Sequence, residues 1–207
     1  MPLRFPENTL PSFEAALALG ADGIELDVHA TADGVVVVHH DPVLEDGREI
    51  RRTMWDQVRA ARVAPDVGIP TLLEVCDVVR DRAELFVEIK GDGIEDAVVD
   101  VLRGHAGTAA IHSFDHMLIA RLSRRGVPHR LGLLIENAPA EPRALMKRHG
   151  ALDLWPERRV VTARLVSDVH AFGGRVFPWT VNDGTEAVRL IAWGVDGLCT
   201  DDVTILA

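Results

Sequence analysis

The sequence predicts an α/β fold of the TIM, or (β/α)8-barrel, type. Short apolar runs typical of strands alternate along the chain with stretches that carry an apolar stripe at helical spacing. This alternation is typical of βα units and of a parallel sheet. A doubly wound sheet usually has a glycine-rich phosphate loop after its first strand, and the common forms of that loop do not occur in this sequence. The barrel is therefore the preferred α/β architecture.

The expected elements follow one another regularly. Each expected strand is a short apolar run, and the runs cover residues 23–28, 85–90, 109–114, 130–135, 152–155, 175–181 and 197–200. Each expected helix has apolar residues three to four positions apart, and the helices cover residues 12–19, 52–61, 71–82, 94–104, 115–125, 141–149, 161–172 and 184–193.

The valine run at residues 35–39 is expected to form a hairpin with the first strand. Asp33 and Gly34 make up a turn dipeptide between the two segments. The run ends in His39, His40 and Asp41. The hairpin therefore brings titratable side chains to a strand end.

One strand of a closed barrel is missing from this succession. A barrel of this class has eight parallel strands, and residues 1–5 are too short to supply a strand with a loop behind it. The barrel is therefore expected to be incomplete at its first strand.

The composition predicts one globular domain over residues 1–207. A formal net charge of -10 disfavours nucleic acid as a partner. No run approaches the roughly 18 apolar residues of a membrane span, and no secretory signal is visible. Cys76 and Cys199 lack metal-ligand spacing and are expected to be reduced thiols of a cytoplasmic protein. The composition gives no oligomeric state.

Glu25 and Asp27 are a pair of acids inside an apolar strand. Side chains of a strand alternate between its faces, so these two share one face. Two like charges on a half-buried face repel each other and lose hydration, unless a cation or a proton bridges them. The pair therefore indicates a functional site.

A second strand end carries Glu88 and Lys90, again on one face. Inward residues at the carboxyl ends of barrel strands build the active site, so these two should converge with the acid pair. Three carboxylates suit a hard divalent cation, Mg²⁺ or Ca²⁺. Lys90, one of only two lysines, is expected to contact an anion. The alternative is a buried counter-ion for Glu88 or Glu25.

His40 is the first candidate for proton transfer. It follows the valine run and lies beside Asp41, and an imidazole can transfer protons near neutral pH. Periodicity does not choose between it and the other histidines near expected strand ends, which are His29, His39, His112 and His116.

Motifs along nearly the whole chain resemble the glycerophosphodiester phosphodiesterases, metal-dependent TIM-barrel enzymes that hydrolyse glycerophosphodiesters to glycerol phosphate and an alcohol. The motifs that carry the resemblance are Pro6-Glu7-Asn8-Thr9, Ile24-Glu25-Leu26-Asp27-Val28, Asp33-Gly34, His40-Asp41-Pro42, Ile69-Pro70-Thr71-Leu72, Glu88-Ile89-Lys90, Ser113-Phe114, Leu131-Gly132-Leu133, Trp179-Thr180-Val181-Asn182, Gly194-Val195-Asp196-Gly197 and Thr200-Asp201.

The resemblance implies a role for each candidate side chain. Glu25, Asp27 and Glu88 would bind the metal, Lys90 would contact the phosphate of a small glycerophosphodiester, and His40 would be one of two catalytic histidines. Trp179 would line the pocket or pack against the substrate's glycerol; plain core packing is the alternative.

The chain departs from the family pattern at its start. The family carries His-Arg-Gly on its first barrel strand, and this triplet is absent from residues 1–207. The leading interpretation is an active enzyme whose given start is misplaced or truncated. The second is an inactive barrel that binds metal and phosphate ligands, and a distant third is a metal-dependent barrel aldolase or isomerase.

Overall fold

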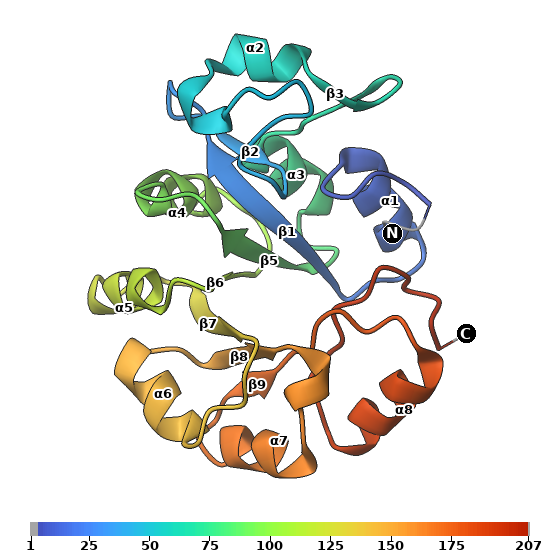
Figure 1. Cartoon of the computed structure of the whole chain (residues 1–207), viewed down its shortest axis with the longest axis vertical. Helices are drawn as coiled ribbons and strands as arrows, with labels where there is room; N and C mark the ends of the chain where they lie inside the picture. The colour runs from blue at the N-terminus through green and yellow to red at the C-terminus, as the bar shows by residue number, and fades with distance from the viewer. Residues whose placement is uncertain (1–3, 207) are drawn as a thin grey trace. The chain divides into compact units, whose positions relative to one another are not determined.

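The computed structural model describes residues 4–206 (Figure 1). The chain divides into two compact units, residues 1–109 and residues 110–207. Across the described residues, none of the helices combines the length and apolar character needed to cross a membrane. The organisation of residues 1–207 as a single domain stays a prediction.

Strand β1 (Gly23–Ala30) is the centre of the sheet in the first unit. It pairs antiparallel with β2 (Val36–Val38), which confirms the predicted hairpin. On its other edge it pairs in parallel with β5 (Glu84–Ile89), with Asp27 opposite Glu88. This register brings the acids of the two strands side by side.

Three helices accompany this sheet: α1 (Leu10–Ala18), α3 (Leu72–Val79) and α4 (Glu95–Leu102). The predicted apolar stripe of α3 is buried, and Leu72, Val75 and Val79 are inaccessible to solvent. A capping box begins this helix, because the Thr71 side chain accepts from the amide of Glu74 while the Glu74 carboxylate accepts from the amide of Thr71.

The helix predicted over residues 52–61 is shorter than expected. A 3₁₀ turn, η1 (Ile50–Arg52), precedes it, and α2 covers only Trp55–Ala60. Thr53 and Met54 between them are extended, because the Thr53 carbonyl accepts from the amide of Ala32. A hairpin of β3 (Arg62–Ala64) and β4 (Val67–Gly68) follows, and the sequence analysis did not predict it.

The second unit contains parallel strands β6 (Ala109–Ser113), β7 (Arg130–Ile135), β8 (Asp153–Pro156) and β9 (Arg175–Val176), in sequence order within the sheet. Its helices are α5 (His116–Arg124), α6 (Pro142–His149), α7 (Ala163–His170) and α8 (Gly184–Ala192), with a 3₁₀ turn, η2 (Arg158–Val160). The predicted alternation of strands and helices is therefore present.

The last two predicted strands are wrong in extent. Of residues 175–181 only β9 is a strand, and residues 197–200 form none in the described chain. The ladder to β8 loses a bond beyond Val176, because Pro156 at the end of β8 has no amide hydrogen to donate, although the amides of Phe177 and Trp179 still donate to the carbonyls of Leu154 and Pro156. The segments still lie side by side, because the Cys199 amide donates to the Pro178 carbonyl and the Val181 amide donates to the Cys199 carbonyl.

Asp153 at the start of β8 joins three strands of the second unit. Its side chain is fully buried and accepts hydrogen bonds at 2.7–3.0 Å from the guanidinium groups of Arg130 on β7 and Arg175 on β9. Replacing Asp153 by alanine is expected to lower the free energy of unfolding by about 3 kcal/mol, because two partly buried guanidinium groups lose their counter-charge.

Urea unfolding monitored by circular dichroism measures this loss. Asp168→Ala is the matched control, because Asp168 forms an exposed pair with Arg164 at 3.5 Å on α7, and such pairs contribute roughly 0–1 kcal/mol. Equal effects of the two substitutions would show that burial of Asp153 does not set its contribution.

Candidate functional site

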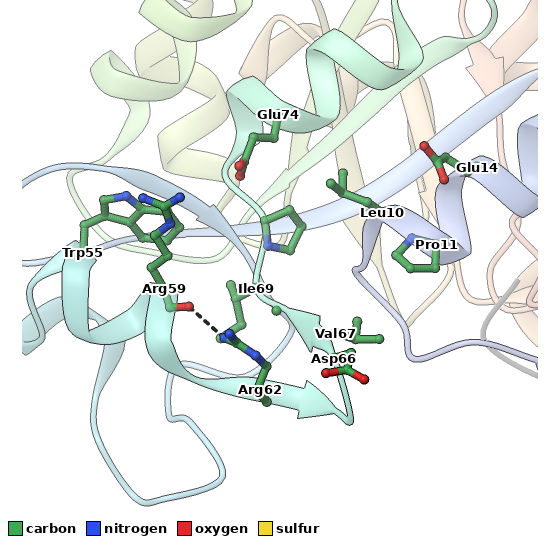
Figure 2. Close-up of a pocket in the computed structure, with 12 residues that line it drawn as sticks. Leu10, Pro11, Glu14, Trp55, Arg59, Arg62, Asp66, Val67, Ile69 and Glu74 are labelled. Carbon is green, nitrogen blue, oxygen red and sulfur yellow. Dashed lines mark hydrogen bonds between the residues drawn. The ribbon is translucent and has the colours of Figure 1, made fainter.

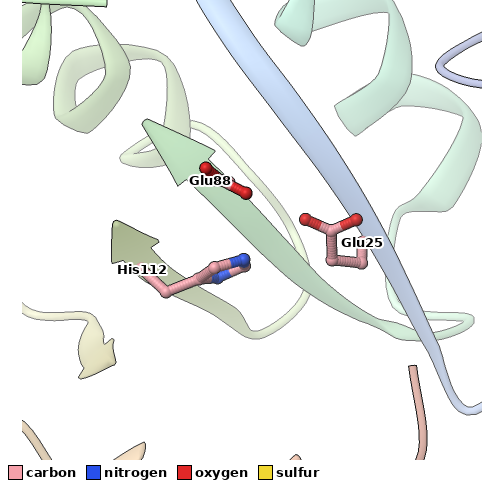
Figure 3. Close-up of side chains that lie close together, drawn as sticks. All are labelled: Glu25, Glu88 and His112. Atoms are coloured by element: carbon pink, nitrogen blue, oxygen red, sulfur yellow. The ribbon is translucent and has the colours of Figure 1, made fainter. Parts of the chain in front are cut away.

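The three predicted metal-binding carboxylates lie together in the first unit. Glu25 and Asp27 come from β1 and Glu88 from β5, in the parallel register that sets Asp27 opposite Glu88. An oxygen of Glu25 and an oxygen of Glu88 lie within 4.8 Å of each other (Figure 3). Asp27 and Glu88 are 6% and 7% exposed. Figure 3 also draws His112, which belongs to β6 in the second unit.

Lys90, just beyond β5, is paired with two of these acids. Its Nζ lies 3.0 Å from Oε1 of Glu88 and 3.3 Å from Oδ1 of Asp27. Burial disfavours the ammonium, but the carboxylates of Asp27 and Glu88 outweigh it and raise the pKa of Lys90. The ion pair with Glu88 that the sequence left open is therefore present, and the lysine stays charged.

The carboxyl group of Glu25 is strongly perturbed. Burial, followed by the negative charge of Asp27, raises its pKa well above the usual range, against the opposing effect of Lys90. Burial is the larger of the two causes, so the ionised form of Glu25 is disfavoured mainly by lost hydration. A nearby cation would favour the ionised form.

Asn8 is a residue of this site that the sequence analysis missed. Its backbone is left-handed, with φ of 57°, and asparagine tolerates this conformation better than most residues. Its Nδ2 donates to Oδ2 of Asp27 at 2.8 Å, and its Oδ1 accepts from the Asp27 amide at 3.1 Å. Asn8 thus fixes both the backbone and the carboxylate of Asp27. Its place in the Pro-Glu-Asn-Thr motif was the available signal.

His40 lies in the turn after β2, where its side chain is 53% exposed. Its Nδ1 donates to the Asp41 carboxylate at 2.8 Å, and this bond lowers the pKa of Asp41. The amide of the preceding His39 donates to the Asp27 carbonyl, so the turn is tied to the strand that carries the acids. With Nδ1 bonded to Asp41, Nε2 is the atom of His40 that can exchange a proton with another molecule.

The other histidines have structural partners. The ring of His39 donates to the Asp41 carbonyl at 2.8 Å, and the ring of His29 donates to the His40 carbonyl at 3.1 Å. In the second unit, His112 stacks on Trp155 with ring centroids 4.4 Å apart, and the ring of His116 donates to the Leu134 carbonyl.

Trp179 lies in the second unit, just after Pro178. Its Nε1 donates to the Trp155 carbonyl at 2.9 Å, and Phe114 packs edge-on against it with centroids 5.6 Å apart. The ring is partly exposed, and its contact with substrate stays a prediction.

A hollow in the first unit does not include the predicted site residues. It has a volume of about 440 Å³ and lies between α2, the β3–β4 hairpin and the starts of α1 and α3 (Figure 2). Arg62, which lines it, donates from Nη1 to the carbonyls of Arg59 and Ala61. The carboxylate cluster is therefore the better candidate for the active site.

Residues 1–205 match the sequence profile of the glycerophosphoryl diester phosphodiesterase family. This chain belongs to that family. A glycerophosphodiester phosphodiesterase from Caldanaerobacter subterraneus subsp. tengcongensis is 32% identical to it, over 95% of this chain and 89% of the relative.

Solved structures agree with the family. A phosphodiesterase from Oleispira antarctica, determined with its product sn-glycerol-3-phosphate, is 26% identical with a TM-score of 0.88, over 95% of this chain and 87% of that one. A glycerophosphodiester phosphodiesterase from Thermotoga maritima is 28% identical with a TM-score of 0.83, over 96% and 90%.

Family membership settles two of the sequence-based predictions. The (β/α)8-barrel class is confirmed by the likeness to these solved family members. The prediction of a phosphoric diester hydrolase is confirmed by the family and by the named relatives. The predicted roles of the individual site residues stay predictions.

Proposed function

We propose that this chain is a metal-dependent phosphodiesterase that hydrolyses glycerophosphodiesters to sn-glycerol 3-phosphate and an alcohol, in cytoplasmic lipid and glycerol metabolism. The observation that carries the proposal is the cluster of Glu25, Asp27 and Glu88 around the ammonium of Lys90. The Oleispira antarctica relative with its bound product supports the choice of substrate class.

The cluster fits a hard divalent cation. Its donors are all carboxylate oxygens, which suit Mg²⁺ or Ca²⁺ better than zinc. Two oxygens that bind one such ion at about 2.0–2.6 Å are at most about 5 Å apart. The separation of at most 4.8 Å between oxygens of Glu25 and Glu88 satisfies this limit.

Hydrolysis would require both stabilisation of negative charge on the phosphate and transfer of a proton, and different residues would supply them. When bound, the cation would supply Lewis-acid polarisation of a phosphate oxygen. Lys90 would hold a second phosphate oxygen and stabilise the negative charge that grows in the transition state. His40 would exchange a proton through Nε2, either with the attacking hydroxyl or with the departing alkoxide.

The experiment is an assay of the 207-residue chain on glycerophosphocholine, followed by phosphorus NMR. A phosphomonoester signal is expected to appear with Mg²⁺ or Ca²⁺, to be absent with EDTA, and to return when the cation is restored. Hydrolysis that continues unchanged in EDTA would contradict the metal role, and no hydrolysis with any cation would contradict the enzymatic role.

A binding protein is the second candidate. The carboxylates and the ammonium of Lys90 would bind a cation and a phosphate group whether or not hydrolysis follows. Saturable binding of sn-glycerol 3-phosphate in the presence of Mg²⁺, without turnover of glycerophosphocholine, would support this second candidate.

Removing the Asn8 side chain is expected to weaken cation binding. Asn8→Gly keeps the left-handed backbone and deletes both hydrogen bonds to Asp27. Because residues that orient a metal ligand affect affinity by about 10–100-fold, the half-saturating Mg²⁺ concentration for turnover is expected to rise about tenfold.

Asp66→Gly is the matched control for this titration. Asp66 is exposed and also left-handed, with φ of 62°, but it lies in the turn between β3 and β4. Its half-saturating Mg²⁺ concentration is expected to stay that of the unsubstituted chain. An equal rise in both variants would make the effect of Asn8 one of backbone conformation alone.

A further inference from the structure

His29 lies on the same face of β1 as Glu25 and Asp27, two positions beyond Asp27. Only 6% of its surface is exposed, and it faces β2 at the position opposite Val37. Its Nε2 lies 3.1 Å from the main-chain carbonyl oxygen of His40. Since a carbonyl oxygen only accepts, the proton of this bond is on His29 Nε2.

The bond between His29 and His40 lies just beyond the last main-chain hydrogen bond of the β1–β2 ladder. The last main-chain bond from the segment after β2 to β1 runs from the His39 amide to the Asp27 carbonyl. The carbonyl of the next residue, His40, accepts a hydrogen bond from the His29 imidazole rather than from a main-chain amide of β1. The buried ring therefore extends the attachment of the turn to β1 by one residue.

Two bonds thus hold His40, at different parts of the residue. His29 fixes its backbone, and Asp41 fixes its ring through Nδ1 at 2.8 Å. Without the backbone bond, rotation about the His39–His40 segment would move the ring together with Asp41. Together these two bonds restrict where Nε2 of His40 points.

We propose that His29 is a positioning residue for His40, which fixes the turn so that the His40 imidazole meets the substrate in one orientation. The inference rests on the proposed function of His40 in proton transfer. His29 itself does not exchange protons with substrate in this account, because its Nε2 is engaged by the His40 carbonyl and its ring is buried.

Two substitutions of His29 distinguish the effect of its hydrogen-bond donor from the effect of its side-chain volume. Leucine fills a similar apolar volume without a donor, whereas the side-chain amide of glutamine places a donor at about the reach of Nε2. Because a misplaced catalytic group costs up to about 100-fold in rate, His29→Leu is expected to lower kcat for glycerophosphocholine about tenfold. KM is expected to stay within about twofold, and His29→Gln is expected to restore most of kcat.

A double-mutant cycle tests whether His29 acts through His40. In the His40→Ala background, His29→Leu is expected to cause no further loss of kcat, because there is no longer a ring to position. The same tenfold loss in both backgrounds would overturn the proposal, as would a His29→Gln variant as slow as His29→Leu, or an unchanged kcat in His29→Leu.

His149→Leu is the matched control. His149 is also buried and also donates from its ring to the main-chain carbonyl of a histidine, His116, at 2.9 Å in the second unit. This variant loses a comparable buried hydrogen bond but is expected to keep kcat. A loss equal to that of His29→Leu would make the effect one of general stability.

Amide exchange measured by NMR keeps the inference testable if the unsubstituted chain does not turn over glycerophosphocholine. That outcome would refute the proposed function. The amides of His40 and Asp41 should still exchange faster in His29→Leu than in His29→Gln and in the unsubstituted chain. Equal exchange in all three proteins would refute the positioning role itself.

Discussion

Replacing Glu25 by glutamine is expected to lower kcat for glycerophosphocholine by about a thousandfold, because a metal ion supplies several kcal/mol of transition-state stabilisation and each 1.36 kcal/mol is about tenfold in rate. The substitution keeps the shape of the side chain and removes one negative charge. With Lys90 already paired with Asp27 and Glu88, the remaining acids would hold a divalent cation poorly.

Steady-state kinetics over a range of Mg²⁺ concentrations measures this effect, and Glu84→Gln is its control. Glu84 is the first residue of β5 and shares a strand face with Glu88, but it lies opposite Gly23 at the other end of the strand pair. Its kcat is expected to stay within about twofold of the unsubstituted chain. Full activity of Glu25→Gln at ordinary Mg²⁺ concentrations would refute the role of Glu25 as a ligand.

Replacing His40 by alanine is expected to lower kcat by about 10²–10⁴-fold, the usual contribution of a general acid or base. The half-saturating Mg²⁺ concentration should not change, since His40 lies outside the carboxylate cluster. The loss is expected in kcat more than in KM, because proton transfer belongs to the chemical step.

His39→Ala separates His40 from its neighbour. The ring of His39 donates to the Asp41 carbonyl and is not assigned a proton in the reaction. Its removal is expected to lower kcat less than about fivefold. A larger loss in His39→Ala than in His40→Ala would reverse the assignment of the two histidines.

The sequence predicted that Glu25 and Asp27 lie together, because the alternation of side chains along one strand is a local property of the sequence. Alternation along β1 puts Glu25 and Asp27 on one face, and this follows from two residues alone. The pairing of β1 with β5 is not local, and only the barrel hypothesis connected Glu88 with the acid pair. The carboxylates and Lys90 are now found together, whereas their roles stay predictions.

Contacts between distant residues account for most of what the sequence did not reveal. The two hydrogen bonds between Asn8 and Asp27 span 19 positions, and the bond from the His29 ring to the His40 carbonyl joins two different strand ends. The strand predicted over residues 175–181 is regular only at Arg175 and Val176, and it ends where β8 ends in Pro156, which has no amide hydrogen to donate. Hydrophobic periodicity contains none of this hydrogen-bonding information.

Binding of Mn²⁺, followed by electron paramagnetic resonance, tests most directly whether the carboxylates of β1 and β5 form a site for a catalytic cation, because carboxylate sites suited to Mg²⁺ also accept Mn²⁺. One bound ion per chain is expected for the unsubstituted protein, and Glu88→Gln should retain none at the same ion concentration. An unsubstituted chain that binds no Mn²⁺, or a Glu88→Gln variant that binds it equally well, would contradict the proposed metal site.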